Sequence, residues 1–247
     1  MLISIAQHAQ PTASDQQTGT SSCLHLIRWD RYPGRPVIET ESIRHVNPDG
    51  SGVLYQQTNA PQPTAATTTR FAAGELHSPI DEPIPTDPVR LNDAVTTATP
   101  PGSGSTAVVA VLLDLTSIRT LNLAERVAVI RVLAMLPGVE LIAWVPGRGT
   151  GVGLQLRFSD GRGDPIDVIT DQDTGEILGY RLEGPAALQS STTTLILRRN
   201  RCDCPPPSRV MFVSAVRRSG FPPSAGCGIP SGVPTFRPAG AYEGARA

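Results

Sequence analysis

A glycine-rich run is the first segment whose composition could do chemistry. Gly147–Gly153 (GRGTGVG) has the glycine density of a phosphate-binding loop. Such loops need GxGxxG spacing or a following Lys-Ser/Thr, and they open a helix whose N–H groups face the phosphate. Here the spacing is absent and an alternating, strand-like segment follows. We therefore predict a hairpin turn rather than a phosphate site.

Two acidic turns carry weaker signals. Asp171–Gly175 (DQDTG) resembles the start of a calcium loop, which requires a bidentate Glu at its twelfth position. That position is Leu182, so the segment predicts an acidic hairpin turn. Arg162-Gly163-Asp164 matches a cell-adhesion tripeptide, but its Asp-Gly and Asp-Pro neighbours already account for a turn.

The cysteines and histidines do not form a recognisable ligand set in the sequence. Cys202-x-Cys204 offers two sulfurs with no second pair and no nearby histidine, so a zinc site is not expected. Three of the four cysteines lie after Asn200, and a disulfide scaffold is not supported. We predict no metal or cofactor. The remaining cysteines are Cys23 and Cys227, and the histidines are His8, His25, His45 and His77.

The sequence also contains no recognisable catalytic motif. There is no GxSxG elbow, and no cysteine has evident His and Asn support. We predict no catalytic residues and no enzymatic activity. The three aromatic residues Trp29, Tyr32 and Trp144 are expected in the core or at its rim, or, if they cluster, around an apolar pocket. The scattered carboxylates, expected on solvated strand faces and turns, are Glu39, Glu41, Asp160 and Asp167.

The charge and the apolar runs of the chain do not favour a nucleic-acid or membrane partner. The net charge is −1 over 247 residues, so no general attraction to nucleic acid or anionic membrane is expected. The longest apolar run, Ala107–Leu113, ends at Asp114, far short of the roughly 20 residues that span a bilayer. The N-terminus lacks the basic and apolar regions of a secretion signal.

The pattern of apolar residues predicts strands, then helices, then further strands. Helices are expected over about Val89–Thr96, and from Asn122 to the stop at Pro137-Gly138. Thr106–Ile118 predicts a buried helix, although its valines would also suit a strand. The predicted strands are Cys23–Trp29, Val37–Val46, Val53–Gln57, Thr67–Ala72, Val139–Val145, Val152–Phe158, Ile166–Thr170, Glu176–Leu182 and Thr192–Arg199.

Two helix starts carry capping signals. Asp87 can cap a helix whose first turn accepts Pro88, which lacks an N–H in any case. Asn122 and Glu125 have capping-box spacing, and Val127, Ile130, Leu133 and Ala134 then mark one buried face.

Both ends of the chain are predicted to be disordered. Residues 1–22 are polar and serve as a lead-in, residues 23–199 form a single α+β domain, and residues 200–247 form a tail rich in Pro, Gly, Ser and Arg. The tail has no sustained period, which also fits a frame-shifted translation.

Several segments in order carry a family resemblance. They are HVNPDGSG (45–52), IPTDPVRLNDAV (84–95), AERVAVIRVLAMLPGVELIAWV (124–145), GVGLQLRF (151–158) and IDVITDQDTGEILGYRL (166–182). Together they resemble an uncharacterised actinobacterial family of membrane-anchored proteins often encoded beside extracytoplasmic-function sigma factors. The likeness covers residues 23–199.

The resemblance implies an extracytoplasmic outer domain, similar in outline to lipoprotein-carrier-like half barrels. It carries over no catalytic residues. The membrane helix that the family places upstream has no counterpart here, and the tail after Asn200 does not match, which suggests a truncated or misread gene.

We therefore expect an α+β fold, with a curved antiparallel sheet of six to eight strands packed against two or three helices. The first functional hypothesis is a non-enzymatic sensing or interaction domain of a sigma-factor-linked regulator, with a membrane-anchored regulator as partner. The alternatives are a carrier for an apolar ligand in a half-barrel cavity, and a gene remnant without function.

Overall fold

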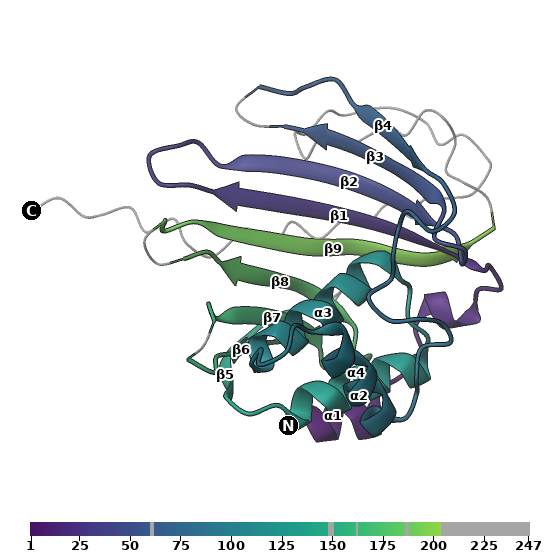
Figure 1. Cartoon of the computed structure of the whole chain (residues 1–247), viewed down its shortest axis with the longest axis vertical. Coiled ribbons are helices and arrows are strands. Elements are labelled where there is room, and N and C mark those ends of the chain that lie inside the picture. The colour runs from purple at the N-terminus through teal and green to yellow at the C-terminus, as the bar shows by residue number, and fades with distance from the viewer. Residues whose placement is uncertain (60–61, 148–150, 162, 186–187, 204–247) are drawn as a thin grey trace, which may run out of the picture. The chain divides into compact units, whose positions relative to one another are not determined.

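Nine strands form one antiparallel sheet in the computed structural model, which describes residues 1–59, 62–147, 151–161, 163–185 and 188–203. The strand order is β4-β3-β2-β1-β9-β8-β7-β6-β5, so β4 and β5 are the edges (Figure 1). The strands are β1 Ser21–Arg31, β2 Ile38–Val46, β3 Gly52–Thr58, β4 Thr67–Phe71, β5 Val139–Pro146, β6 Val152–Phe158, β7 Ile166–Asp171, β8 Ile177–Glu183 and β9 Ser191–Cys202.

The helices gather over the β5–β8 end of this sheet (Figure 1). They are α1 Leu2–His8, the short 3₁₀ helix η1 Ala13–Gln16, α2 Pro88–Ala98, α3 Ser105–Ile118 and α4 Leu123–Met135. None of the helices in the described ranges has both the length and the apolarity to cross a membrane. The predicted α+β class is confirmed. The described residues form nine strands and four α-helices, where six to eight strands and two or three helices were expected.

The main core lies between the helices and strands β6 and β7. Alternate residues of β6 point into it, because successive side chains of a strand face opposite sides of the sheet. Leu154, Leu156 and Phe158 are fully buried there, as is Leu133 of α4 at 1% exposure. Each such side chain stabilises the fold by roughly 1.5–3 kcal/mol relative to leaving it in water.

Helix α4 is buried on more sides than a single apolar stripe predicts. Ala128, Val129 and Val132 are fully buried, whereas Val127 and Ala134 are only half-buried. The reason is tertiary, since α1 and α2 pack against α4 in addition to the core.

The two predicted helix caps, Asp87 and Asn122, are both present. Asn122 Oδ1 accepts from Glu125 N at 3.0 Å and Glu125 Oε2 accepts from Asn122 N at 2.7 Å, which completes the capping box. Helix α3 begins after Gly104, which has no side chain to cap with. Asp160, from the turn between β6 and β7, substitutes for it by accepting from Thr106 N at 3.2 Å.

The prediction of a disordered N-terminal tail is wrong. Leu2, Ile5 and Ala6 of α1 are buried, and Ile5 lies beside Ile130 of α4 at the β7–β8 turn. The apolar face of α1 is only one turn long, too short to stand out in a polar segment. At the other end, β9 runs to Cys202, past the boundary predicted at Asn200. Residues 204–247, the rest of the predicted tail, lie outside the described residues.

Candidate functional site

Both glycine-containing motifs connect antiparallel strands. Gly147 N donates to Gly151 O at 2.9 Å between β5 and β6, although residues 148–150 are outside the described ranges. Asp171–Gly175 is a tight turn between β7 and β8, with Asp171 Oδ1 accepting from Thr174 N at 2.9 Å and Gly175 at φ 67°. This confirms the predicted acidic hairpin. Arg162 of the adhesion-like tripeptide is not among the described residues.

Two of the carboxylates expected on solvated faces are buried and paired. Glu41 is 2% exposed, and its Oε1 lies 2.6 Å from His25 Nε2 on the neighbouring strand. Asp167 is 3% exposed and accepts from Arg157 Nε at 2.7 Å. The expectation of solvated side chains is wrong here, because cross-strand partners compensate the charge inside the sheet.

The aromatic residues do not cluster. Trp29 is half-buried on β1 and donates its Nε1–H to Glu39 at 2.9 Å. Tyr32 lies in the turn after β1 and is 47% exposed. Trp144, on the edge strand β5, is 58% exposed and lines a pocket.

This pocket, here called the α1–β5 groove, has a volume of about 520 Å³. That volume is within the range of roughly 300–1,000 Å³ typical of ligand sites. Helix α1 supplies one wall and the edge of the sheet supplies the other. The lining residues are Met1, Ser4, Ile5, His8, Gln10, Trp144, Leu154, Gln172 and Asp173.

The groove has an apolar part and a polar part. Trp144 pairs with Leu154 in the β5–β6 register, so both side chains lie on the helix-covered face of the sheet. Leu154 is fully buried in the core and Trp144 is largely exposed, so the apolar core continues outward into the groove. His8, Gln172 and Asp173 are exposed and supply hydrogen-bonding groups beside it.

Further apolar side chains are exposed on the edge strand β5 and on its neighbour β6. Leu141 and Ile142 of β5 are 42% and 43% exposed, and Val152 of β6 is 40% exposed. Among the strands of the described residues, β5 pairs only with β6, so within this part of the chain its other side presents unpaired backbone N–H and C=O groups. A bulge at Ile142 interrupts the register between Leu141 and Ala143.

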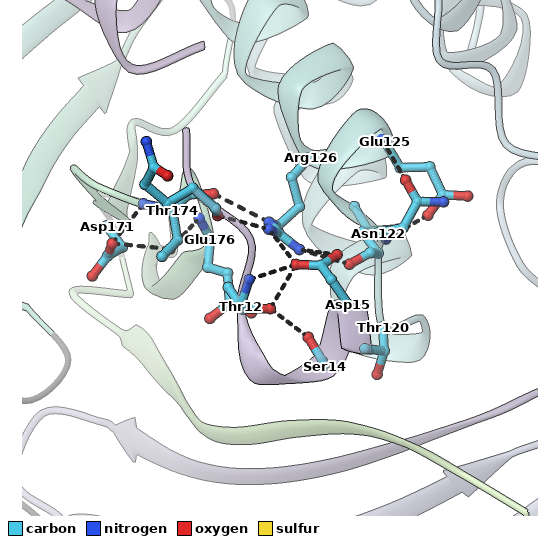
Figure 2. A network of polar contacts seen from close by, with 12 residues as sticks. Thr12, Ser14, Asp15, Thr120, Asn122, Glu125, Arg126, Asp171, Thr174 and Glu176 are labelled. Carbon is cyan, nitrogen blue, oxygen red and sulfur yellow. Dashed lines mark hydrogen bonds and ion pairs between the residues drawn. The ribbon is translucent and has the colours of Figure 1, made fainter. Parts of the chain in front are cut away.

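A buried polar network fixes the α1 wall of the groove (Figure 2). Arg126 of α4 is 2% exposed and lies between the N-terminal segment and the β7–β8 turn. Its Nη2 donates to Asp15 Oδ2 at 2.9 Å and to Gln10 O at 3.3 Å, and its Nε donates to Thr174 O at 3.1 Å. Gln10 N also donates to Asp173 O at 2.7 Å. The N-terminal segment that forms this wall is therefore hydrogen-bonded both to helix α4 and to the β7–β8 turn.

Asp15 is held in its charged form by this network. Burial by itself raises the pKa of Asp15, but hydrogen bonds from Arg126 and Thr12 outweigh it, and the pKa lies below its ordinary value. Thr12 contributes its N–H at 2.6 Å and its hydroxyl at 2.9 Å.

The opposite half of the sheet provides a different surface. Arg44 Nη1 donates to Ser117 O of α3 at 3.0 Å, which identifies the helix-facing side of β2. By alternation and register, that side also carries the apolar residues Val46, Leu54 and Phe71 and the polar residues Thr40, Ser42, Gln56, Thr58 and Thr67. The helix-facing side of β2–β4 is therefore a mixed surface of apolar and polar side chains.

Cys23 and Cys202 form a disulfide with Cα atoms 6.2 Å apart. The sequence did not support this pairing, because Cys202 was assigned to the tail. The structure places it in β9, antiparallel to β1, where Ser21 pairs with Cys202 and Cys23 with Asn200.

Comparisons with known proteins found matches among solved structures alone. No protein-family model matches the chain, and no curated protein matches it in sequence. Among solved structures, the chain is similar to the crystal structure of MucB, at 14% identity and a TM-score of 0.34, over 83% of this chain. The chain spans 59% of the length of that protein.

A second similar structure is a LolA-superfamily protein, NE2245 from Nitrosomonas europaea. The identity is 7% and the TM-score 0.22, over 83% of this chain and 93% of the other.

Proposed function

We propose that this chain is a non-enzymatic interaction domain whose α1–β5 groove binds an extended segment of a partner protein. One apolar side chain of that segment enters the groove against Trp144, and its backbone pairs with the free side of β5. The observation that carries the proposal is the exposure of Trp144 beside the groove, on a strand whose outer backbone is unpaired.

The unpaired backbone favours a peptide over a lipid as occupant. An added strand satisfies exposed N–H and C=O groups and presents alternate side chains to a pocket. An acyl chain fills the groove but leaves these groups to water. The bulge at Ile142 and Pro146, which has no N–H, confine pairing to a short stretch beside Trp144.

The engagement of the charged groups supports a non-enzymatic role. Glu41, Asp160 and Asp167 hold His25, the start of α3 and Arg157, respectively. The resemblance of residues 23–199 to proteins encoded beside sigma factors supports a regulator as the protein to which this domain belongs.

The test selects binders from a displayed library of extended peptides against the full chain, with a Trp144→Ala chain as the counter-selection target. Selected peptides should lose at least about tenfold in affinity on Trp144→Ala, since interface tryptophans are frequent hot spots. They should also protect the amides of Val139–Val145 from hydrogen exchange. Tyr32→Ala removes another exposed aromatic side chain, outside the groove, and should change neither readout.

Peptides that bind both chains equally and protect no amide of β5 would overturn the proposal. The volume of the groove favours one second candidate, a small apolar ligand. Native mass spectrometry of the purified chain distinguishes the two, because a co-purifying molecule of defined mass that blocks peptide binding indicates the carrier function instead.

A further inference from the structure

Three potential metal ligands meet on the face of the sheet that points away from the helices. Cys23 of β1 lies directly opposite His45 of β2 in the strand register, and Cys202 comes from β9 on the other side of β1. One ligand atom from each residue lies within 4.8 Å of the other two. Arg44 faces α3, so its neighbour His45 points to the opposite side.

His45 is the unusual member of this group. It is 4% exposed, and its Nε2 has no hydrogen-bond partner among the described residues. Leaving a buried polar atom unpaired normally costs free energy, so such an atom calls for an explanation. His25 on the same face of β1 provides the contrast, since its Nε2 lies 2.6 Å from Glu41 Oε1.

The position of His45 suits a ligand. Its buried Nε2 has no hydrogen-bond partner among the described residues, and the residue lies on the same face of the sheet as Cys23. Val53, its partner on β3, is also buried and helps to exclude water.

We propose that reduction of the Cys23–Cys202 disulfide creates a three-ligand zinc site from the two thiolates and the His45 imidazole. The inference is independent of the α1–β5 groove. Imidazole and thiolate are preferred ligands of Zn²⁺, and three protein ligands leave the fourth tetrahedral position for water or an added ligand. Disulfide formation removes both thiolate ligands, so the chain binds zinc only when Cys23 and Cys202 are reduced.

The geometry requires only a small opening. With Zn–S distances of about 2.3 Å, tetrahedral thiolates stand about 3.8 Å apart. The present Cα separation of 6.2 Å is compatible with that spacing, and the three ligand atoms already lie within 4.8 Å of one another.

The chemistry balances with a dithiol as reductant. Two electrons and two protons from the dithiol convert the disulfide to two thiols, while the dithiol becomes a disulfide. Zn²⁺ then replaces the two thiol protons, which pass to the buffer. The neutral imidazole binds without releasing a proton.

The experiment uses the full chain with Cys204→Ser and Cys227→Ser, so that the remaining thiols cannot bind metal. The protein is reduced, freed of reductant under nitrogen and titrated with Co²⁺, a spectroscopic probe for Zn²⁺ sites. One Co²⁺ per reduced chain should bind with thiolate charge-transfer absorption, and Zn²⁺ should displace it. The oxidised chain should show no such absorption.

His45→Ala retains both cysteines and should weaken Co²⁺ binding at least about 10–100-fold, since even outer-shell partners contribute that much. His77→Ala, which removes an exposed histidine elsewhere in the chain, is the control and should bind as the parent does. Calorimetry in buffers of different ionisation enthalpy should give close to two protons released per Zn²⁺ at pH 7.

Folding is monitored alongside binding. Zn²⁺ should raise the melting temperature of the reduced parent chain and not that of reduced His45→Ala. The proposal is overturned if the reduced chain binds no Co²⁺, if it binds without thiolate absorption, if His45→Ala binds as tightly as the parent, or if the reduced chain stays unfolded with Zn²⁺.

Discussion

The guanidinium of Arg126 and the carboxylate of Asp15 form a two-point ion pair across 111 residues of sequence. Nη1 reaches Oδ1 at 3.1 Å and Nη2 reaches Oδ2 at 2.9 Å. The remaining N–H groups donate to the carbonyls of Leu121, Gln10 and Thr174. All five donors of the arginine are therefore used, which a lysine cannot reproduce.

Arg126→Ala should destabilise the domain by about 3–5 kcal/mol, because it leaves the Asp15 carboxylate and three backbone carbonyls without their donor. Arg126→Lys should recover only part of the loss. Urea unfolding measures both variants. Arg131→Ala, on the exposed side of α4, is the control and should stay within about 0.5 kcal/mol of the parent. A loss at Arg126 no larger than at Arg131 would show that the network is dispensable.

Docking of the N-terminal segment should depend on acid pH. The pKa of Asp15 is lower in the folded state than its ordinary value of 3.8, so the unfolded state binds more protons as the pH falls. The stabilisation is complete above about pH 4 and is lost as the pH falls through the lowered folded pKa. Hydrogen exchange of α1 amides between pH 5 and 2, on the scale of these pKa values, should show it, and Asp15→Asn should flatten the dependence. An unchanged profile in Asp15→Asn would assign the acid response to other carboxylates.

Reducing the Cys23–Cys202 disulfide without metal should lower stability by up to about 5 kcal/mol, the loop-entropy value for a sequence separation of 179 residues. Thermal melts with and without reductant measure the loss. The Cys204→Ser, Cys227→Ser chain should behave as the parent. If reduction leaves the melting temperature unchanged, the cross-link restrains the unfolded chain less than loop entropy predicts.

Gly104→Ala should remove the cap of α3. A Cβ at this position would stand 1.8 Å from Asp160 Oδ2, so the carboxylate must leave the N–H of Thr106. The expected loss is about 1–2 kcal/mol. Asp160→Ala should cost at least as much, because Asp160 also accepts from Ser105 Oγ and Gly163 N. The double variant should lose less than the sum, because both single changes break the contact with Thr106 N.

Ser103→Ala, an exposed change in the same loop, is the control for these variants. Fully additive losses in the double variant would mean that Gly104 and Asp160 act separately. Chemical denaturation of the parent, the two single variants, the double variant and Ser103→Ala decides between the two outcomes.

The sequence predicts those features that depend on neighbouring residues. The Asn122–Glu125 box, the Asp87 cap and the acidic turn at Asp171 are all encoded within a few positions, and each is found. The choice of helix for Thr106–Ile118 required tertiary information, since valines suit either state until the core surrounds them.

Contacts between distant segments were the part that the sequence could not provide. His45 and Cys202 lie 157 positions apart by number and become neighbours only through the pairing of β2, β1 and β9. Trp144 was recognised as a rim or pocket residue, but the other wall of its groove comes from α1, which was assigned to a disordered lead-in. Neither relationship has a local pattern.

Strand β9 joins the two halves of the sheet. Before it, the chain has made two separate four-stranded meanders, β1–β4 and β5–β8, and β9 joins them by pairing with β1 and β8. During synthesis both meanders must therefore wait with open inner edges until residues 191–202 emerge. Such non-local closure slows folding, and open edges invite pairing with other chains. A nascent chain therefore remains prone to pairing with other chains until β9, the last described strand, has closed the sheet.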